Sequence, residues 1–425
     1  MKVRKVSGKV NLEKEFIVGF DVGSQRINGY AEHLCDGEKL SFEEEFKNMT
    51  YDIKSALRQY CKHATSLGYE RLKVVCEPTG GYEKMLLDIA EDMGFLTAYV
   101  SGESVSKLGI VGTNDYGKTD SKDPRTITYL AKTGCCLTRR TGEDIYKRMK
   151  LLNRMYNEED RSVVAAKNLF YSYLKDLFWD NRRSNSFYFN TKLGQLLVRD
   201  FKCSPFRMRE LGYKNFCSHV KAKIKVRKAY LDELWDDVVS SCDRGMDEQL
   251  RSIYEGRLDE LYGDWEKHDG KKKKYMEQID GLFRQTKEYE KLKGIMTQCG
   301  EGNLARLVAE TGSLSDFGCA DQFLKYAGLN ITEKKSGKFI GKMKISKRGN
   351  SLLRKVLYQI CCFRMTRSIF RDYYREAKER LRIPIKAVIS VMRKFLKMIL
   401  GIVKSSSVFD ENRIFVSQGD FKKVA

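Results

Sequence analysis

Residues 16–23 read Phe16-Ile17-Val18-Gly19-Phe20-Asp21-Val22-Gly23. A short apolar run of this kind, bounded by glycine, is typical of a buried β-strand. Asp21 comes at the end of the run, so we expect the strand to deliver a carboxylate to the rim of a sheet. This stretch decides the fold class, because the segments that follow it alternate between strand and helix patterns, as in an α/β domain.

The pattern predicts a definite order of elements over the first 135 residues. Three strands come first and are expected to be antiparallel, and helices and strands alternate after them. The strands are predicted at 16–21, 27–34, 39–46, 72–77 and 96–100, and the helices at 51–66, 82–93 and around 120–123. This is the order of an RNase H-like nuclease domain.

Four carboxylates fall where that fold needs metal ligands. Asp21 and Glu77 each end an apolar run, the second in VVCEPTG at 74–80. Asp120 and Asp123 are three residues apart in KTDSKD at 118–123, which places both on one face of a helix. Magnesium takes oxygen ligands, and paired magnesium ions suit phosphodiester chemistry. We therefore predict that the four hold Mg²⁺, two ions per site, with Mn²⁺ as the alternative metal.

These carboxylates also have ordinary structural interpretations. An aspartate at the end of a strand often caps a turn or helix. Asp123 could instead form an ion pair with Lys122 or Arg125.

Charge indicates a polyanionic partner. The 425 residues carry 79 Lys and Arg against 57 Asp and Glu, a net charge of +22, and such a surplus favours nucleic acid. Residues 331–404 hold 21 of the cations and only four acids. The charge is thus concentrated, as a binding surface requires.

The sequence predicts a cytoplasmic, nucleoid-associated protein and no membrane role. Residues 1–15 are polar and basic, unlike a signal peptide, and the apolar run at 398–403 is too short to span a bilayer. The twelve cysteines contain no CxxC pair and have apolar neighbours, as reduced thiols in the cytosol do.

The middle of the chain is predicted to be helical from about Glu143. A heptad seam runs through Leu258, Leu261, Trp265, His268, Lys272, Tyr275, Ile279 and Leu282. It indicates either a coiled coil, which would favour oligomers, or an amphipathic helix in a bundle. We predict three domains: residues 1–142, a helical and coiled-coil region at 143–293, and a mostly helical domain at 294–425.

Two further patterns belong to the last domain. CGEGN at 299–303 is expected to open a helix, whose first N–H groups could face a phosphate. The apolar stripe of the final helix, predicted at 385–403, is expected to be core.

Together these motifs resemble the DEDD transposases or recombinases of the IS110 group of insertion sequences, relatives of the Piv and MooV invertases. The N-terminal part of the resemblance rests on GFDVG at 19–23, EPTGGY at 77–82 and KTDSKD at 118–123. The C-terminal part rests on YAGL at 326–329, Ser336-Gly337, ISKRGN at 345–350 and LRK at 353–355 through Tyr358. The two parts cover roughly half of the chain.

The resemblance implies a RuvC-like N-terminal domain and a C-terminal transposase domain with a serine nucleophile. Ser336 occupies that motif position, and Ser346 is the second candidate. The implied reaction cleaves and rejoins donor and target double-stranded DNA through a covalent phosphoserine intermediate. The implied partners are a structured non-coding guide RNA, which selects sequence by base pairing, and further copies of the chain in a homodimer or tetramer.

The chain departs from the family in two places. The usual Pro-Gly-Ile-Gly turn is replaced by QCGEG at 298–302, which puts DNA contact by that turn in doubt. The middle region is also longer than in compact members, so residues 143–293 are poorly assigned.

Nucleic-acid contacts are expected from polar side chains in the basic C-terminal segment. They are Lys334, Lys335, Lys338, Ser346, Lys347, Arg348, Asn350, Arg354 and Lys355.

Two rival functions remain. One is a RuvC-like structure-specific endonuclease of the Holliday-junction type, which needs no serine. The other is a non-catalytic nucleic-acid-binding protein. The four histidines form neither a paired-His metal motif nor the His-x-x-Arg motif expected of tyrosine recombinases, which argues against other recombinase chemistries.

Overall fold

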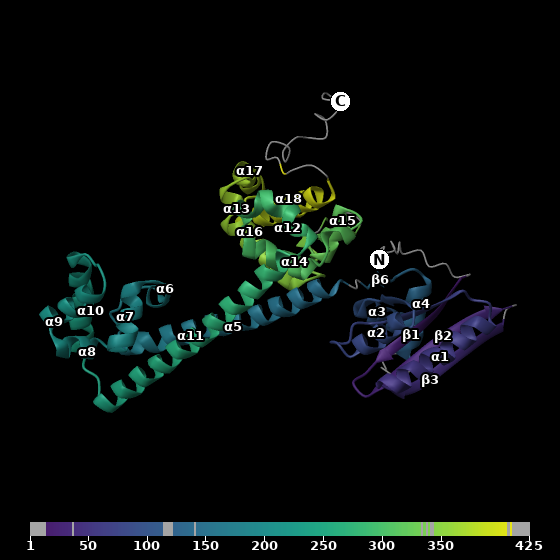
Figure 1. The fold of residues 1–425 in the computed structure, drawn as a ribbon, viewed down its shortest axis with the longest axis horizontal. Coiled ribbons are helices and arrows are strands. Elements are labelled where there is room, and N and C mark those ends of the chain that lie inside the picture. Colours follow the sequence, from purple (N-terminus) through teal and green to yellow (C-terminus); the bar gives the residue numbers. More distant parts are fainter. Residues whose placement is uncertain are drawn as a thin grey trace, which may run out of the picture. The chain divides into compact units, whose positions relative to one another are not determined.

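The structure is a computed structural model that describes residues 14–35, 38–113, 122–139, 142–332, 335–336, 339–340, 344–405 and 409. The chain divides into two compact units, Met1–Thr141 and Gly142–Ala425, and each is described by itself. The predicted sequence of an α/β part followed by a mostly helical part is confirmed (Figure 1). The further division at residue 293 stays a prediction.

The first unit contains a six-stranded sheet in the order β3-β2-β1-β4-β5-β6. Strands β1, β2 and β3 are antiparallel neighbours, whereas β4 and β5 run parallel to β1, and β6 is antiparallel to β5. The elements are β1 (Glu15–Val22), β2 (Arg26–Cys35), β3 (Glu38–Lys47), α1 (Thr50–Ser66), β4 (Arg71–Cys76), α2 (Glu83–Asp92), β5 (Leu96–Tyr99), α3 (Gly102–Thr113), α4 (Lys122–Lys132) and β6 (Leu137–Thr138). All five predicted strands are present.

Helices cover both faces of this sheet. Alternate residues of β1, such as Val18 and Phe20, pack with α1 and α2 in one core. Ile17 and Val75 point the other way, into a second core with Val105 of α3 and Ile127 of α4. Because side chains alternate along a strand, Asp21 shares the α3 and α4 side with Ile17.

A glycine lets α4 approach β1. A Cβ on Gly19 would lie 2.5 Å from both the Pro124 carbonyl oxygen and Thr128 Oγ1. The Gly19 N–H instead donates to Thr128 Oγ1 at 3.0 Å. The glycine of the opening motif therefore allows the first turns of α4 to lie directly on β1, two residues before Asp21.

The second unit is built on two long antiparallel helices, α5 (Asp144–Leu177) and α11 (Glu248–Phe283), which lie side by side in Figure 1. The predicted heptad seam packs here against α5 of the same chain. Its polar members are paired, since His268 contacts Glu159 and Lys272 contacts Asp160 at 3.4 Å. The seam therefore has an intramolecular partner and gives no argument of its own for oligomers.

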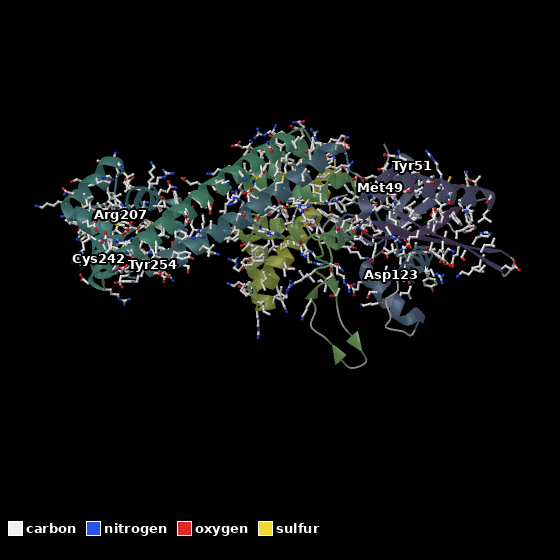
Figure 2. All side chains as sticks on the ribbon, turned by 90° about the horizontal axis from the view of Figure 1, so that it is seen from below. Met49, Tyr51, Asp123, Arg207, Cys242 and Tyr254 are labelled. Atoms are coloured by element: carbon white, nitrogen blue, oxygen red, sulfur yellow. The ribbon has the colours of Figure 1, made fainter. Side chains whose placement is uncertain are left out.

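One end of this helical hairpin carries a small lobe. Its helices are α6 (Asn185–Asn190), α7 (Lys192–Phe201), α8 (Pro205–Leu211), α9 (Tyr213–Lys223) and α10 (Lys228–Asp243) (Figure 1). Their core joins Phe170 of α5 to Leu258 and Trp265 of α11. Buried Asp237 of α10 holds the connection between α5 and α6 through ion pairs with Arg182 and Arg183. Arg207, which is labelled in Figure 2, pairs with the buried Glu255 of α11.

The other end of the hairpin shares a core with the C-terminal helices. Tyr146 and Met149 of α5 and Phe283 of α11 join Leu307 and Phe395 there. The remaining helices are α12 (Lys287–Leu292), η1 (Lys293–Ile295), α13 (Met296–Cys299), α14 (Glu301–Thr311), η2 (Leu314–Asp316), α15 (Ala320–Tyr326), α16 (Ser351–Phe363), η3 (Met365–Arg367), α17 (Arg371–Leu381) and α18 (Pro384–Lys404). The predicted apolar stripe of α18 is buried, as expected.

Two general expectations can be compared with the described residues. No helix among them is long and apolar enough to cross a membrane. The eleven cysteines whose side chains are described are all free thiols, in keeping with the predicted reduced state.

Candidate active site and nucleic-acid contacts

Asp21 and Glu77 come from neighbouring strand ends. Strands β1 and β4 are parallel, and Phe20 is the register partner of Cys76. Asp21 and Glu77 directly follow these partners, Asp21 within β1 and Glu77 just after β4, so both come at the carboxyl edge of neighbouring strands, which are about 4.8 Å apart. The Glu77 carboxylate reaches the start of α3, where a Cβ on Gly102 would be 3.1 Å from Glu77 Oε2.

Asp123 lies in the first turn of α4. It directly precedes Pro124, whose carbonyl oxygen packs against Gly19 of β1. The close contact with β1 therefore holds the start of α4 on the sheet face that Asp21 shares. Asp120 lies outside the described residues.

The donor set suits a hard cation, because carboxylate oxygens are the ligands that magnesium takes. Over the ranges that the structure describes, no three His, Cys, Asp or Glu side chains gather as a metal-binding group. The fourth predicted ligand is outside those ranges. The four-carboxylate site stays a prediction, and two of its predicted members, Asp21 and Glu77, come from neighbouring strands.

A buried carboxylate that the sequence analysis missed shapes the turn after Glu77. Glu83 is 5% exposed, and its Oε2 accepts hydrogen bonds from Thr79 N and Thr79 Oγ1, both at 3.2 Å, and from Gly81 N at 2.9 Å. Gly80 and Gly81 both have positive φ, which glycine adopts without strain. The only sequence signal was the acidic residue that ends EPTGGYE at 77–83.

We expect Glu83→Ala to lower recombination by roughly 10- to 100-fold, because residues that support metal ligands typically have effects of this size. The half-saturating Mg²⁺ concentration should rise as well. Glu83→Gln should restore most activity, since an amide oxygen can accept the same hydrogen bonds. An unchanged metal dependence in Glu83→Ala would contradict a positioning role.

Ser336 lies on a short β-hairpin. Strand β8 (Lys335–Ser336) pairs with β9 (Phe339–Ile340), and Ser336 is the register partner of Phe339. A second pair, β7 (Ile331–Thr332) and β10 (Lys344–Ile345), joins the chain on either side of this hairpin. The two pairs appear as the lower green strands in Figure 2. Lys334 and Lys338 lie outside the described residues.

Two of the motifs that carry the family resemblance form one backbone unit. The Asn350 N–H donates to the Tyr326 carbonyl at 2.9 Å, and the Lys347 N–H donates to the Gly328 carbonyl at 3.0 Å. A Cβ on Gly349 would lie 2.4 Å from the Tyr326 oxygen, so only glycine fits. YAGL at 326–329 and SKRGN at 346–350 therefore fold against each other.

Four of the predicted nucleic-acid contacts have partners within the chain. Ser346 Oγ bonds Asn330, and Arg354 Nη1 donates to the Ala327 and Gly349 carbonyls. Asn350 caps α16 and also donates to Glu310, and Lys355 pairs with Asp160 of α5 at 2.8 Å. Lys347 and Arg348 are exposed beside them. The motif thus joins segments that are far apart in the chain, and its role in nucleic-acid binding stays a prediction.

The expected helix at CGEGN is present as α14, but two acids surround its first turn. Glu301 pairs with Arg284 at 2.8 Å. Asp280 of α11 lies nearby, with Oδ1 3.7 Å from where a Cβ on Gly302 would be. Burial, together with the negative charge of Glu301, raises the pKa of Asp280 to about 6. The two carboxylates disfavour a phosphate at this turn.

We expect Asp280→Asn to stabilise the protein at neutral pH. A raised pKa means that the folded state favours the protonated acid, so stability is lost as pH rises from about 4 to about 6. The shift would correspond to roughly 3 kcal/mol, which solvent screening of this half-exposed group reduces to about 1 kcal/mol. Thermal melts should show the variant's advantage at pH 7.5 and none near pH 4. A gain in melting temperature that is the same at both pH values would show that the charge of Asp280 is not the cause.

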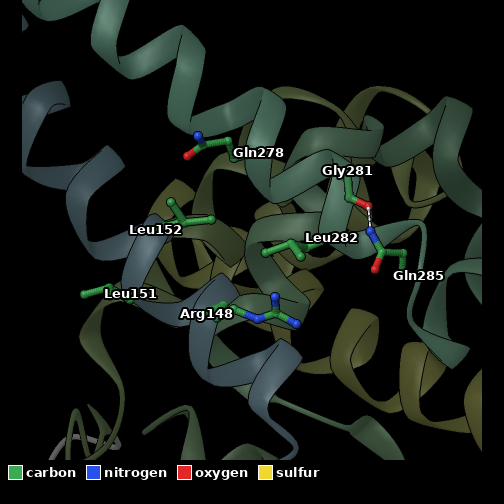
Figure 3. A pocket seen from close by; sticks show the side chains of 7 residues that line it. All are labelled: Arg148, Leu151, Leu152, Gln278, Gly281, Leu282 and Gln285. Atoms are coloured by element: carbon green, nitrogen blue, oxygen red, sulfur yellow. Dashed lines mark hydrogen bonds between the residues drawn. The ribbon is translucent and has the colours of Figure 1, made fainter.

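A cavity of about 460 Å³ opens between α5 and α11. It is lined by Arg148, Leu151, Leu152, Gln278, Gly281, Leu282 and Gln285 (Figure 3). Its lining contains neither a carboxylate nor a candidate nucleophile. The cavity therefore plays no part in the candidate site.

Comparison with protein families gives two matches. A family model for the DEDD transposases of IS110 elements matches residues 18–179. A model of the transposase IS116/IS110/IS902 family matches residues 292–375. The first range includes the four carboxylates and the second includes Ser336, and together they cover more than half of the chain. A comparison with curated proteins gave no match.

Proposed function

Because this chain belongs to the IS110 group of DEDD transposases, we propose that it is an RNA-guided DNA recombinase with a covalent phosphoserine intermediate. As a transposase it acts on DNA. The observation that carries the proposal is the parallel pairing of β1 with β4, in which Asp21 and Glu77 directly follow the register partners Phe20 and Cys76, within the segment that matches the DEDD family.

The first unit is proposed to be RuvC-like. Its strand order, with three antiparallel strands followed by two parallel ones, supports an RNase H-like sheet. In that arrangement the carboxyl edge of β1 and β4, with the start of α4, presents acids to one phosphodiester.

Asp21, Glu77, Asp120 and Asp123 would hold the metal, which we propose to be Mg²⁺, with Mn²⁺ as a substitute. Metal ions bound by such acids stabilise charge on the attacking and leaving oxygens of a phosphoryl transfer. Asp21 lies on β1 and Glu77 directly follows β4, so the hydrogen-bonded sheet positions the backbone of both. Glu83 in turn holds the backbone that follows Glu77.

Ser336 is proposed to be the nucleophile. Its Oγ loses its proton and attacks the scissile phosphorus, so that an Oγ–P bond forms as one DNA P–O bond breaks, and the leaving DNA oxygen takes up a proton. A hydroxyl of the second DNA then loses its proton and attacks the same phosphorus, which breaks the Oγ–P bond, and the released Ser336 Oγ takes up a proton. One ester bond replaces another at each step, so rejoining needs no further energy input.

The proposed partners are a structured guide RNA and other copies of the chain. The carboxylates and Ser336 lie in different units and more than two hundred residues apart in sequence. A homodimer could combine them between subunits, and two dimers could hold donor and target DNA. We propose that this takes place in the cytosol, on nucleoid DNA.

Sequencing of RNA bound to the purified protein tests the guide. We expect one structured RNA, encoded beside the transposase gene, to be strongly enriched over total RNA. Its loops should be complementary to the two DNA sites. Recovery of random cellular RNA alone would count against a dedicated guide and favour the structure-specific endonuclease.

A further inference from the structure

The lobe contains a segment whose charges are all positive. Residues 211–231 hold Lys214, Lys221, Lys223, Lys225, Arg227 and Lys228, and no Asp or Glu. The segment comprises α9 and the connection to α10. It also lies between the two family matches, which end at residue 179 and begin again at 292.

Helix α9 separates its apolar and basic residues. Phe216, Cys217 and Val220 are buried in the lobe core. Lys214 and Lys221 are exposed and are seven residues apart, about two helical turns, so they share one outer face. The core thus fixes which way this face points.

The connection after α9 adds further exposed cations to those of the helix. Ile224 and Arg227 have extended backbone angles, and side chains alternate along such a segment. Ile224 and Val226 pack on the lobe core, whereas Lys225 and Arg227 are exposed, as is Lys228 at the start of α10. We call the set Lys214, Lys221, Lys225, Arg227 and Lys228 the α9 basic surface.

Acids follow this surface on α10, and the first of them, Asp232, accepts a hydrogen bond from the Tyr213 hydroxyl. Asp200 of α7 lies beside this surface, and its Oδ2 is hydrogen-bonded to Lys223 at 2.6 Å and to His219 at 2.7 Å. Asp237 of α10 is buried against Arg182 and Arg183. In the described part of the chain, none of the five residues of the α9 basic surface takes part in an ion pair.

We propose that the α9 basic surface is a second nucleic-acid contact, which binds the phosphate backbone of a duplex. The helix turns and the extended residues give a contour on the order of 20 Å, long enough for several phosphates of one strand. No acid within the segment opposes a polyanion, and contacts of this type position a duplex without reading its sequence. This proposal rests on one part of the proposed function, namely that the transposase binds DNA and a guide RNA.

The test compares two variants of the full chain with equal charge. The surface variant is Lys221→Gln, Lys225→Gln, Arg227→Gln and Lys228→Gln. The control variant removes four exposed lysines that are scattered over the same unit: Lys192→Gln, Lys267→Gln, Lys274→Gln and Lys287→Gln. Bound RNA is first removed at high salt, and equal melting temperatures establish that both variants fold.

The measurement is fluorescence anisotropy with a 30-bp DNA duplex and, separately, a 30-bp RNA duplex, between 50 and 250 mM KCl. We expect the surface variant to bind at least tenfold more weakly at 100 mM, with a log–log salt slope smaller by about 2–4, since each phosphate contact contributes about 0.9 for B-DNA. The control variant should change the slope by less than about 1. The duplex with the larger loss identifies the natural partner.

Retention of binding by Lys221→Arg, Lys225→Arg and Lys228→Arg would support charge as the cause. Equal binding by the surface and control variants would overturn the proposal. So would loss of binding to vesicles of 30% phosphatidylserine without loss of duplex binding, because the surface would then serve a membrane. None of these assays needs strand cleavage, so a failure of the serine mechanism would leave the result intact.

Discussion

Ser336→Ala is expected to abolish recombination, with a fall of roughly 10⁴-fold or more, as for loss of the nucleophile in other enzymes with covalent intermediates. Alanine has no oxygen that can bond to phosphorus. The carboxylates would remain, but DNA could not be held on the protein for rejoining. The measurement is trapping of protein-linked DNA after denaturation, together with a strand-exchange assay with guide RNA and both DNA sites.

Ser346→Ala is the matched control, since Ser346 lies in the same basic segment and its hydroxyl bonds Asn330. The Ser346→Ala variant should still form the protein–DNA adduct, in the same amount as the wild type. If Ser346→Ala alone removes the adduct, the nucleophile is Ser346. If cleavage survives Ser336→Ala and wild type forms no adduct, the endonuclease interpretation replaces the recombinase.

Asp21→Asn and Glu77→Gln are each expected to reduce strand cleavage by roughly 10³-fold or more, because removal of one strong electrostatic contact from an active site has effects of this order. Both substitutions keep the shape of the side chain, so the sheet should remain folded. Cleavage should depend on added Mg²⁺ or Mn²⁺ and stop with EDTA. DNA binding at low salt should persist, which separates loss of chemistry from loss of substrate.

Asp92→Asn provides the control, since Asp92 is an exposed carboxylate at the end of α2. It should leave cleavage within about twofold of wild type, as expected for a surface change away from the site. Unchanged transposition in Asp21→Asn and Glu77→Gln would mean that the carboxylates are not catalytic. The chain would then be a nucleic-acid-binding protein with an inactive nuclease fold.

Much of the fold could be predicted because its signals are local. The strand predicted at 16–21 is Glu15–Val22, and the helix predicted at 385–403 is Pro384–Lys404. Apolar spacing and glycine boundaries lie within a few residues of each other in sequence. Helix α3 was not predicted, because its residues show no clear apolar period.

The site was predicted less completely. The strand patterns identified Asp21 and Glu77 as rim carboxylates, but not that their strands are adjacent and in register. Glu83 was missed because a buried acid looks like any acidic residue at the start of a helix. Asn350 and Lys355 were assigned to nucleic acid, whereas their bonds to Glu310 and Asp160 join segments that are far apart in the chain.

The sequence by itself therefore determined the fold class, the element order, the transposase family and the types of side chain available for chemistry, because period, composition and motif are properties of neighbouring residues. Only the tertiary structure decided which of them meet. The heptad seam packs on α5, α4 lies on β1 at Gly19, and the five cations around α9 are all exposed. Such contacts form between segments that are far apart in sequence and depend on how their buried surfaces pack, so they cannot be predicted from the pattern of neighbouring residues.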